Sequence, residues 1–246
     1  MARTALRRGL NNRWWPARLV DARAETATAR TLRFAVPGWP GHLAGQHIDV
    51  RLTAQDGYTA QRSYSLSAAS DGEYVEITVQ LVSDGEVSPY LVGEMQVGDA
   101  VEVLGPLGGW FVWRPEQAEP AQLIGGGAGV APLMAMWRTH TQVSSGAPMR
   151  LLYSARGPQD TYFAAELRGH TGVAVLYSRE APPDDPRRPH RIDAHDLADH
   201  TWPASREPTC YVCGPTPFVE AVIALLLDTH HDPARVRAER FGATGG

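Results

Sequence analysis

The sequence predicts two domains, a mainly β domain followed by an α/β domain. The chain has 246 residues, more than the usual size of about 100–150 residues for one domain. In its first half, short segments alternate apolar and polar residues with a period of two. In its second half, patterns typical of strands alternate with patterns typical of helices. A linker-like stretch separates the two halves. We expect a basic tail over residues 1–14, an all-β domain over residues 15–115 and an α/β domain over residues 120–246.

The first half is predicted to consist of short, half-buried strands. In residues 47–52 and 75–81 apolar side chains alternate with polar ones, as in an antiparallel strand with one face toward a core. A further strand is expected at residues 100–104, after one or two helical turns at residues 88–94. Glycine-containing turns separate such segments at residues 37–41, 56–57, 71–72 and 84–85. Strands this short and evenly spaced predict a barrel or a sandwich.

The second half alternates strands with helices. Apolar segments predict strands at residues 122–125, 150–154, 173–177, 209–213 and 236–241. Helices are expected at residues 132–141, 161–167 and 217–227, and a loop rich in proline and arginine at residues 181–191. This alternation predicts a parallel sheet covered by helices.

Charge and composition exclude several classes of protein. The net charge of −4 gives no reason to expect a nucleic-acid partner. All 23 basic residues are arginines, and the absence of lysine excludes a Walker A loop, a protein kinase and a pyridoxal-phosphate Schiff base. The longest apolar run, residues 221–227, is too short to cross a membrane.

Two cysteines, Cys210 and Cys213, are too few for an iron–sulfur cluster or a four-cysteine zinc site. Their C-x-x-C spacing is also that of a thioredoxin-like redox pair. Because residues three apart on a strand face opposite sides, we expect free thiols, as in a reduced cytoplasmic protein. The histidines lack a metal-binding spacing, and we expect those close together in the sequence to be solvated: His195, His200, His230 and His231.

Two motifs in the second half have the form of an anion-binding turn. The cluster Gly125-Gly126-Gly127-Ala128-Gly129 follows a strand and precedes a helix with Pro132 in its first turn, so free amides would face a phosphate. Cys213-Gly214-Pro215 ends another strand, and ligands of open α/β sheets bind beyond such ends. Alone, the first motif is also explained by a plain turn, and Cys213 by a small buried side chain.

The first half carries a second group of motifs. In Arg62-Ser63-Tyr64-Ser65, Arg62 and Tyr64 share one face of a strand, and a guanidinium beside an aromatic ring suits a flavin nucleotide. Gly85-Glu86-Val87-Ser88 precedes a helical turn and offers amides to a phosphate, and Gly105-Pro106-Leu107-Gly108 follows a strand. The alternatives are cross-strand packing with a surface salt bridge, and tight turns.

Together, and in this order, these five motifs resemble the ferredoxin–NADP reductase family. The resemblance runs from about residue 15 to the end of the chain, where Glu239-Arg240-Phe241-Gly242 is similar to the family's terminal acid–aromatic element. It implies a six-stranded antiparallel flavin-binding barrel followed by a parallel-sheet nucleotide-binding domain. It also implies FAD as the flavin and a pyridine nucleotide as its reductant.

The same resemblance implies roles for individual residues. The implied catalytic residues, nearest the reacting atoms, are Ser65, Cys213 and Glu239. The implied flavin-binding residues are Arg62, Tyr64, Ser65, Gly85, Val87, Ser88 and Phe241. The implied nucleotide-binding residues are Gly126, Gly127, Gly129, Pro132, Ser154, Arg156, Arg179, Cys213, Gly214 and Pro215.

The residues that follow two of the strands favour NADP over NAD. An NAD site usually has an acidic residue about 20 positions after the glycines, on the ribose 2′-hydroxyl. Here the next strand ends in Ser154-Ala155-Arg156, with no carboxylate before Asp160, and the following strand ends in Ser178-Arg179. Hydroxyl and guanidinium groups suit a 2′-phosphate, and solvated loop arginines are the alternative.

We therefore expect a cytoplasmic, NADPH-dependent FAD flavoprotein that passes hydride to flavin N5 and then single electrons to a separate acceptor protein. The low cysteine count implies an acceptor on another chain: ferredoxin, flavodoxin, a P450, an oxygenase component or another metalloenzyme. One alternative is a reductase of free flavin, quinone or oxygen, and another is a non-catalytic flavin-binding or assembly module. We expect no metal site, nucleic-acid partner or integral membrane segment.

Overall fold

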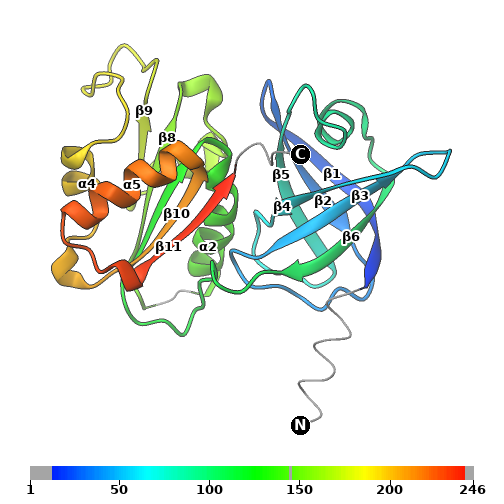
Figure 1. Ribbon diagram of the computed structural model, residues 1–246, viewed down its shortest axis with the longest axis horizontal. Helices are drawn as coiled ribbons and strands as arrows, with labels where there is room; N and C mark the ends of the chain where they lie inside the picture. Colours follow the sequence, from blue (N-terminus) through cyan, green and yellow to red (C-terminus); the bar gives the residue numbers. More distant parts are fainter. Residues whose placement is uncertain (1–12, 144–145, 242–246) are drawn as a thin grey trace, which may run out of the picture. The chain divides into compact units, whose positions relative to one another are not determined.

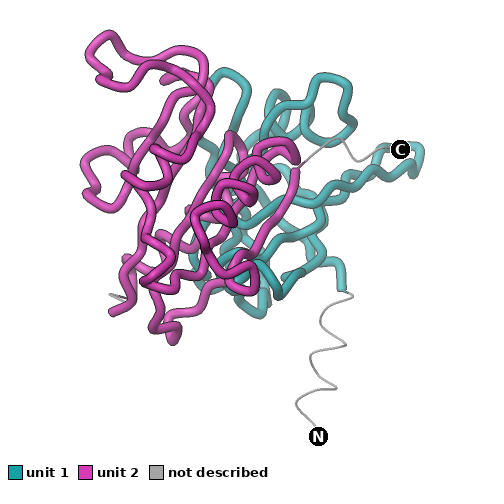
Figure 2. The backbone as a smooth tube through the Cα atoms, turned by 60° about the vertical axis from the view of Figure 1, so that its left-hand side comes forward, with its two compact units in different colours: residues 1–112 teal, residues 113–246 magenta. Residues whose placement is uncertain are grey.

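The computed structural model describes residues 13–143 and 146–241, and the chain divides into two compact units, residues 1–112 and residues 113–246 (Figure 2). Each unit has its own sheet and its own hydrophobic core. Most of the predicted basic tail lies outside the described residues, and Trp14 belongs to the first strand. Among the described residues, no helix is long and apolar enough to cross a membrane.

Unit 1 is a six-stranded antiparallel sheet in the order β4-β3-β6-β1-β2-β5 (Figure 1). Its elements are β1 (Trp14–Thr26), β2 (Ala29–Ala35), β3 (His47–Thr53), β4 (Thr59–Ser65), β5 (Tyr74–Gln80), the helical turn η1 (Tyr90–Glu94) and β6 (Ala100–Leu107). Just beyond β4, Leu66 forms a bridge with Ile77 of β5, and the amide of Ser67 donates to the Glu76 carbonyl at 2.9 Å. The two ends of the sheet are thereby joined, and unit 1 is a barrel.

The predicted alternation separates the inside of this barrel from its outside. Ile48 and Val50 of β3 are fully buried in the barrel core, as are the alternate residues of β5. On β3 between and beyond them the side chains are polar, and Arg51 donates to both carboxylate oxygens of Glu102 on β6 at 2.9 Å. The Arg51 guanidinium also lies 4.0 Å from the ring centre of Trp14. Apolar packing inside and charge pairing outside thus fix the register of this strand.

Unit 2 is a five-stranded parallel sheet in the order β11-β10-β7-β8-β9. Its strands are β7 (Ala121–Gly126), β8 (Met149–Ala155), β9 (Val173–Tyr177), β10 (Thr209–Pro215) and β11 (Val236–Phe241). Its helices are η2 (Gly127–Gly129), α2 (Val130–Val143), η3 (Pro158–Asp160), α3 (Ala164–Leu167), α4 (Ala194–His200), η4 (Ala204–Arg206), α5 (Thr216–Asp228) and η5 (Pro233–Arg235). The predicted helix at residues 161–167 is wrong in its first turn, because Phe163 takes a left-handed φ of 56° immediately before α3.

The order in which strands are added to this sheet reverses at β7. Strands β8 and β9 are added on one side of β7, and β10 and β11 on the other. Helices α4 and α5 pack on one face through Leu197, Val222 and Leu226, and α5 crosses that face in Figure 1. On the other face, α2 brings Leu133 against Gly125. The carboxyl ends of β7 and β10 therefore form a topological switch point, where ligands of open α/β sheets bind.

The cysteine and histidine predictions have different outcomes. Cys210 and Cys213 are free and buried, and their spacing on β10 places them on opposite faces of the sheet, as expected. The expectation of solvated histidines is wrong for His231, which is only 7% exposed. Its ring nitrogens lie 3.0 Å from the Trp202 carbonyl oxygen and 3.2 Å from that of Leu226. The ring thus occupies the end of α5, where helix carbonyls lack intrahelical partners.

Candidate functional site

The turns that follow β7 and β10 are in direct backbone contact. Cys213 and Gly125 are register partners at the ends of these two parallel strands. A Cβ atom on Gly129 would lie 2.2 Å from the Cys213 carbonyl oxygen and 2.6 Å from the Gly214 Cα. Because no side chain fits there, the glycine is what lets two motifs far apart in the sequence meet.

Phe218 of α5 fills the space that two other glycines leave open. Its ring would lie 2.7 Å from a Cβ on Gly126 and 2.8 Å from one on Gly214. Phe218 is not identifiable from the sequence, because a helical pattern does not show which side chain will cover a turn. It gives the switch point an aromatic support on the side of α5.

The glycine-rich turn leads directly into a helix N-terminus. Gly127 has a left-handed φ of 53°, and a Cβ there would meet no atom within 4 Å. Helix α2 begins at Val130, with Pro132 in its first turn, as the sequence predicts. The N-terminus of α2 therefore lies directly after a turn with open space at Gly127, which suits an anionic phosphate.

Cys213 and Glu239 are neighbours on β10 and β11, where they are register partners. Burial, with a further contribution from the Glu239 charge, raises the pKa of the Cys213 thiol well above its usual value. Burial also raises the pKa of Glu239 to about 7. The thiol is therefore neutral, which excludes a reactive thiolate of the thioredoxin type, and Glu239 is a group that exchanges a proton near neutral pH.

One carboxylate oxygen of Glu239 is buried without a hydrogen-bond partner among the described residues. A buried acceptor without a donor costs free energy unless water or a ligand supplies one. Phe241, two residues further, ends β11 opposite Pro215, and Gly242 lies outside the described residues. The unsatisfied carboxyl thus marks the ends of β10 and β11 as a place for a donor from a ligand.

The predicted 2′-phosphate residues lie at the edge formed by the ends of β8 and β9. Ser154 is half-buried near the end of β8, and Arg156 and Arg179 are exposed just beyond the two strands. The amide of Arg179 donates to the Arg156 carbonyl at 2.9 Å, and the Ser178 hydroxyl donates to the Ala155 carbonyl at 3.2 Å. Neither of the two guanidiniums forms an ion pair within residues 13–143 and 146–241. Both are therefore available to an anion.

In unit 1, the register places Arg62 and Tyr64 on one face of β4, as the sequence predicts. Their partners on β3 are Val50 and Ile48. Tyr64 packs against the barrel core, and this burial raises its pKa to about 12. Arg62 is half-exposed, with its guanidinium 3.7 Å from the Glu86 carboxylate. A ring held by the core and an exposed guanidinium beside it fit a flavin phosphate.

The loop before η1 has the form of an anion-binding turn. The Ser88 hydroxyl accepts from the Val82 amide at 3.0 Å, and the Gly85 amide donates to the Val82 carbonyl at 2.9 Å, so both residues close the loop. The amides of Glu86, Val87 and Ser88 have no acceptor among the described residues. Three consecutive open amides suit a phosphate oxygen.

Ser65, at the end of β4 opposite His47, is 7% exposed.

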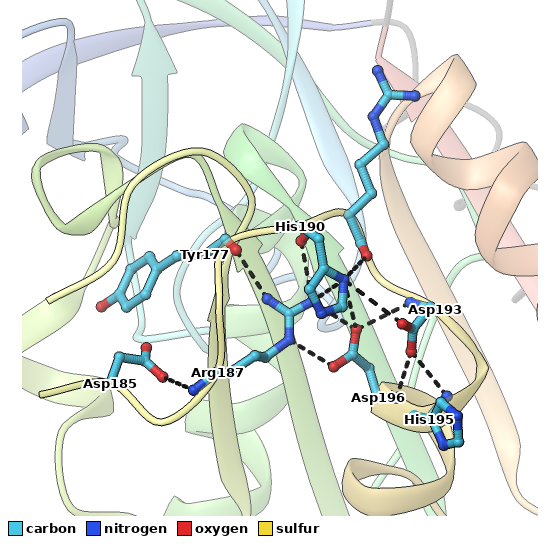
Figure 3. A network of polar contacts seen from close by, with 8 residues as sticks. Tyr177, Asp185, Arg187, His190, Asp193, His195 and Asp196 are labelled. Atoms are coloured by element: carbon cyan, nitrogen blue, oxygen red, sulfur yellow. Dashed lines mark hydrogen bonds and ion pairs between the residues drawn. The ribbon is translucent and has the colours of Figure 1, made fainter. Parts of the chain in front are cut away.

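One cluster of side chains has the composition of a metal site. The ligand atoms of His190, Asp193 and Asp196 lie within 4.8 Å of one another (Figure 3). However, Arg187 donates to both carboxylate oxygens of Asp196 at 2.7 Å, and Asp193 and Asp196 also accept backbone amides at the start of α4. The carboxylates are thus engaged with donors, as in an ion pair and a helix cap.

Comparison with known proteins agrees with this arrangement. The sequence matches the family model described as oxidoreductase FAD-binding domain over residues 16–112, and the model described as oxidoreductase NAD-binding domain over residues 123–223. A solved structure with a similar fold is the flavohaem-like FAD/NAD-binding domain of nitric oxide dioxygenase from Vibrio cholerae. Its TM-score is 0.81 at 27% identity, over 93% of this chain and 98% of that one.

Two curated relatives are reductase components of monooxygenases. The glycine betaine monooxygenase reductase subunit of Chromohalobacter salexigens is 31% identical over 81% of this chain. The propane 2-monooxygenase reductase component of Mycolicibacterium smegmatis is 28% identical over 84% of this chain. The aligned part of this chain spans 56% and 61%, respectively, of the length of these relatives.

Replacing Gly129 tests the backbone contact at the switch point. In Gly129→Ala the new methyl would overlap the Cys213 carbonyl, so we expect a loss of about 3 kcal/mol in unfolding free energy and weaker nucleotide binding. Denaturant unfolding and calorimetric titration with NADP⁺ measure the two effects. The control is Gly146→Ala, whose methyl would meet no atom within 4 Å. Equal stability of the two variants would contradict the close contact.

Glu239 predicts a specific pH dependence of stability. Because its pKa rises from 4.5 to about 7 on folding, the folded chain binds more protons than the unfolded chain between these values. The unfolding free energy should therefore fall as pH rises through this range. In Glu239→Gln the fall between about pH 5 and about pH 8 should be smaller by about 2 kcal/mol. Urea unfolding at both pH values measures it, with the exposed Glu220→Gln as control. A wild-type pH dependence in Glu239→Gln would refute the assignment.

Proposed function

Because the chain belongs to the ferredoxin–NADP reductase-like family of two-domain flavin reductases, we propose that it is an NADPH-dependent FAD oxidoreductase that passes electrons to a separate acceptor protein. The observation that carries the proposal is the switch point, where Gly129 packs on Cys213 beside the unsatisfied carboxyl of Glu239. When bound, the flavin would accept a hydride from the nicotinamide and release the electrons singly.

In unit 1, we assign the phosphates of FAD to two groups of donors. The Arg62 guanidinium supplies a planar fork, and the loop before η1 supplies the open amides of residues 86–88. Tyr64 presents a ring whose orientation is fixed by the barrel core, which suits contact with the isoalloxazine. The hydroxyl of Ser65, the last residue of β4, would approach N5, as the family resemblance implies.

In unit 2, we assign the NADPH pyrophosphate to the glycine-rich turn and the N-terminus of α2 that follows it. The Cys213-Gly214-Pro215 turn would orient the nicotinamide, and the neutral Cys213 thiol offers it an uncharged surface. Glu239 would hold a proton close to the reacting atoms, since its pKa lies near 7. These residues bind, orient and exclude water, and the hydride chemistry belongs to the cofactors.

The preference for NADPH over NADH rests on the edge beyond β8 and β9. Ser154, Arg156 and Arg179 bring one hydroxyl and two unpaired guanidiniums to this edge. A 2′-phosphate carries charge that these groups can neutralise, whereas a 2′-hydroxyl gains little from them. At the end of β8, the position of the carboxylate that binds the 2′-hydroxyl in NAD sites, no acidic residue occurs between Ser154 and Asp160.

The acceptor we favour is the oxygenase component of a monooxygenase system, since two relatives carry names of that kind. Ferredoxin, flavodoxin, a P450 or another metalloenzyme are the other protein acceptors to test. A reductase of free flavin, quinone or oxygen is the alternative without a protein acceptor. The cytoplasmic location stays a prediction.

Flavin content and nucleotide reduction test the proposed activity. The purified protein should be yellow, and NADPH added without oxygen should bleach it, with a dissociation constant about tenfold lower than that for NADH. Spectrophotometry under anaerobic conditions measures both. A colourless protein that does not take up FAD, or a yellow one that NADPH leaves oxidised, would refute the oxidoreductase proposal. Faster reduction by NADH would overturn only the nucleotide preference.

Ser65→Ala tests the residue placed nearest to the flavin N5. We expect flavin reduction to slow about tenfold or more, with little change in NADPH affinity, because only a contact to the reacting atoms is lost. Stopped-flow absorbance of the FAD-loaded protein measures the rate. Ser63→Ala is the matched control on the same strand, with its hydroxyl bound to Asp49 on β3. Reduction of Ser65→Ala at the wild-type rate would remove Ser65 from the mechanism.

A further inference from the structure

We propose that Arg187 is a positioning residue for recognition of the nucleotide 2′-phosphate, acting through the loop that carries Arg179. This inference rests on the NADPH preference proposed above. Arg187 lies within the proline- and arginine-rich loop, which the sequence predicts only as a connection between strand and helix. Its side chain is 15% exposed, although the loop around it is largely exposed to solvent.

The Arg187 guanidinium is engaged by three separate parts of the chain (Figure 3). Its Nε and Nη2 donate to the two carboxylate oxygens of Asp196, both at 2.7 Å. Its Nη1 donates to the Tyr177 carbonyl at 2.9 Å, and Nη2 also donates to the His190 carbonyl at 3.0 Å. A planar fork is needed to reach these acceptors at once, and an ammonium group cannot replace it.

These contacts connect the beginning of the loop to its end. Tyr177 is the last residue of β9, His190 closes the loop, and Asp196 lies in the first turn of α4. The His190 amide donates to the same Tyr177 carbonyl at 3.2 Å. The Tyr177 carbonyl oxygen therefore holds the two ends of the loop together. Arg187 thus fixes the point from which the chain continues to Arg179, two residues later.

Arg187 does not itself offer a free fork to a phosphate. Each of its three guanidinium nitrogens already donates to an acceptor of the protein. Arg179, by contrast, has no ion pair among the described residues, and its amide is held by the Arg156 carbonyl. A loop ordered before binding spares the nucleotide the cost of ordering it. The contribution of Arg187 is therefore to hold the phosphate-binding edge in place.

The experiment compares two nucleotides in the FAD-loaded protein. In Arg187→Gln, assayed with an added one-electron acceptor that reoxidises the flavin, we expect the KM for NADPH to rise about tenfold, with the KM for NADH and both kcat values changed less than about twofold. Independently of turnover, calorimetric titration should show about tenfold weaker binding of 2′,5′-ADP and unchanged binding of AMP. The control is Arg235→Gln, which removes an arginine paired with Glu207 at the other end of the sheet and should match the wild type.

The variant Asp196→Asn distinguishes an effect of positioning from an effect of charge. It also provides a second test if Arg187→Gln does not fold. This substitution removes a negative charge from the protein, so an effect of charge alone would tighten binding of the anionic 2′,5′-ADP. Positioning predicts the opposite, a weakening of about threefold or more, because the fork of Arg187 loses its ionic partner. Tighter or unchanged binding would overturn the inference.

The outcomes distinguish this inference from the proposed function. If the wild type prefers NADPH and Arg187→Gln loses that preference selectively, the inference stands. If the wild type prefers NADPH and the variant affects both nucleotides equally or neither, the inference is wrong and the proposed function remains. If the wild type shows no preference for NADPH, the nucleotide assignment fails and the inference fails with it.

Discussion

The missing side chain at Gly129 is the constraint on which the site in unit 2 depends. With 2.2 Å between its absent Cβ and the Cys213 carbonyl oxygen, no other residue lets the two turns touch. That contact places the helix N-terminus of α2 beside the ends of β10 and β11, and hence beside the buried carboxyl of Glu239. Amides that favour anions and a carboxyl of raised pKa are therefore held together by packing of backbone on backbone.

Unit 1 obtains its order in a different way, from a closed sheet with an alternating sequence. The buried residues of β3 and β5 leave the intervening positions free to carry polar groups. Arg62 and Tyr64 share one face of β4, where Tyr64 is held by the core and Arg62 remains half-exposed. Each unit thus carries its candidate site residues on a sheet with its own core.

Much of the fold is predictable from local patterns, and what is missed depends on contacts distant in sequence. The alternation located β3 and β5, and the sheet of unit 2 follows from its apolar segments. The sequence does not locate β1, where Pro16 and a register shift near Asp21 disturb the alternation. The motifs at both sites could be named in advance, because glycine and arginine carry their chemistry locally. The roles of Phe218 and Arg187 and the burial of His231 could not be predicted. Each depends on contacts with residues that are distant in the sequence and meet only in the folded chain.

The two free thiols of β10 are natural labelling sites for measuring local unfolding of unit 2. The side chain of Cys210 belongs to the core beneath α5, whereas that of Cys213 lies on the opposite face of the sheet. Both are buried, and burial keeps both as unreactive thiols. A maleimide can therefore modify one of them only after the layer above that face has moved away. Labelling kinetics at the two positions would report the local unfolding of each layer separately, in the unaltered chain.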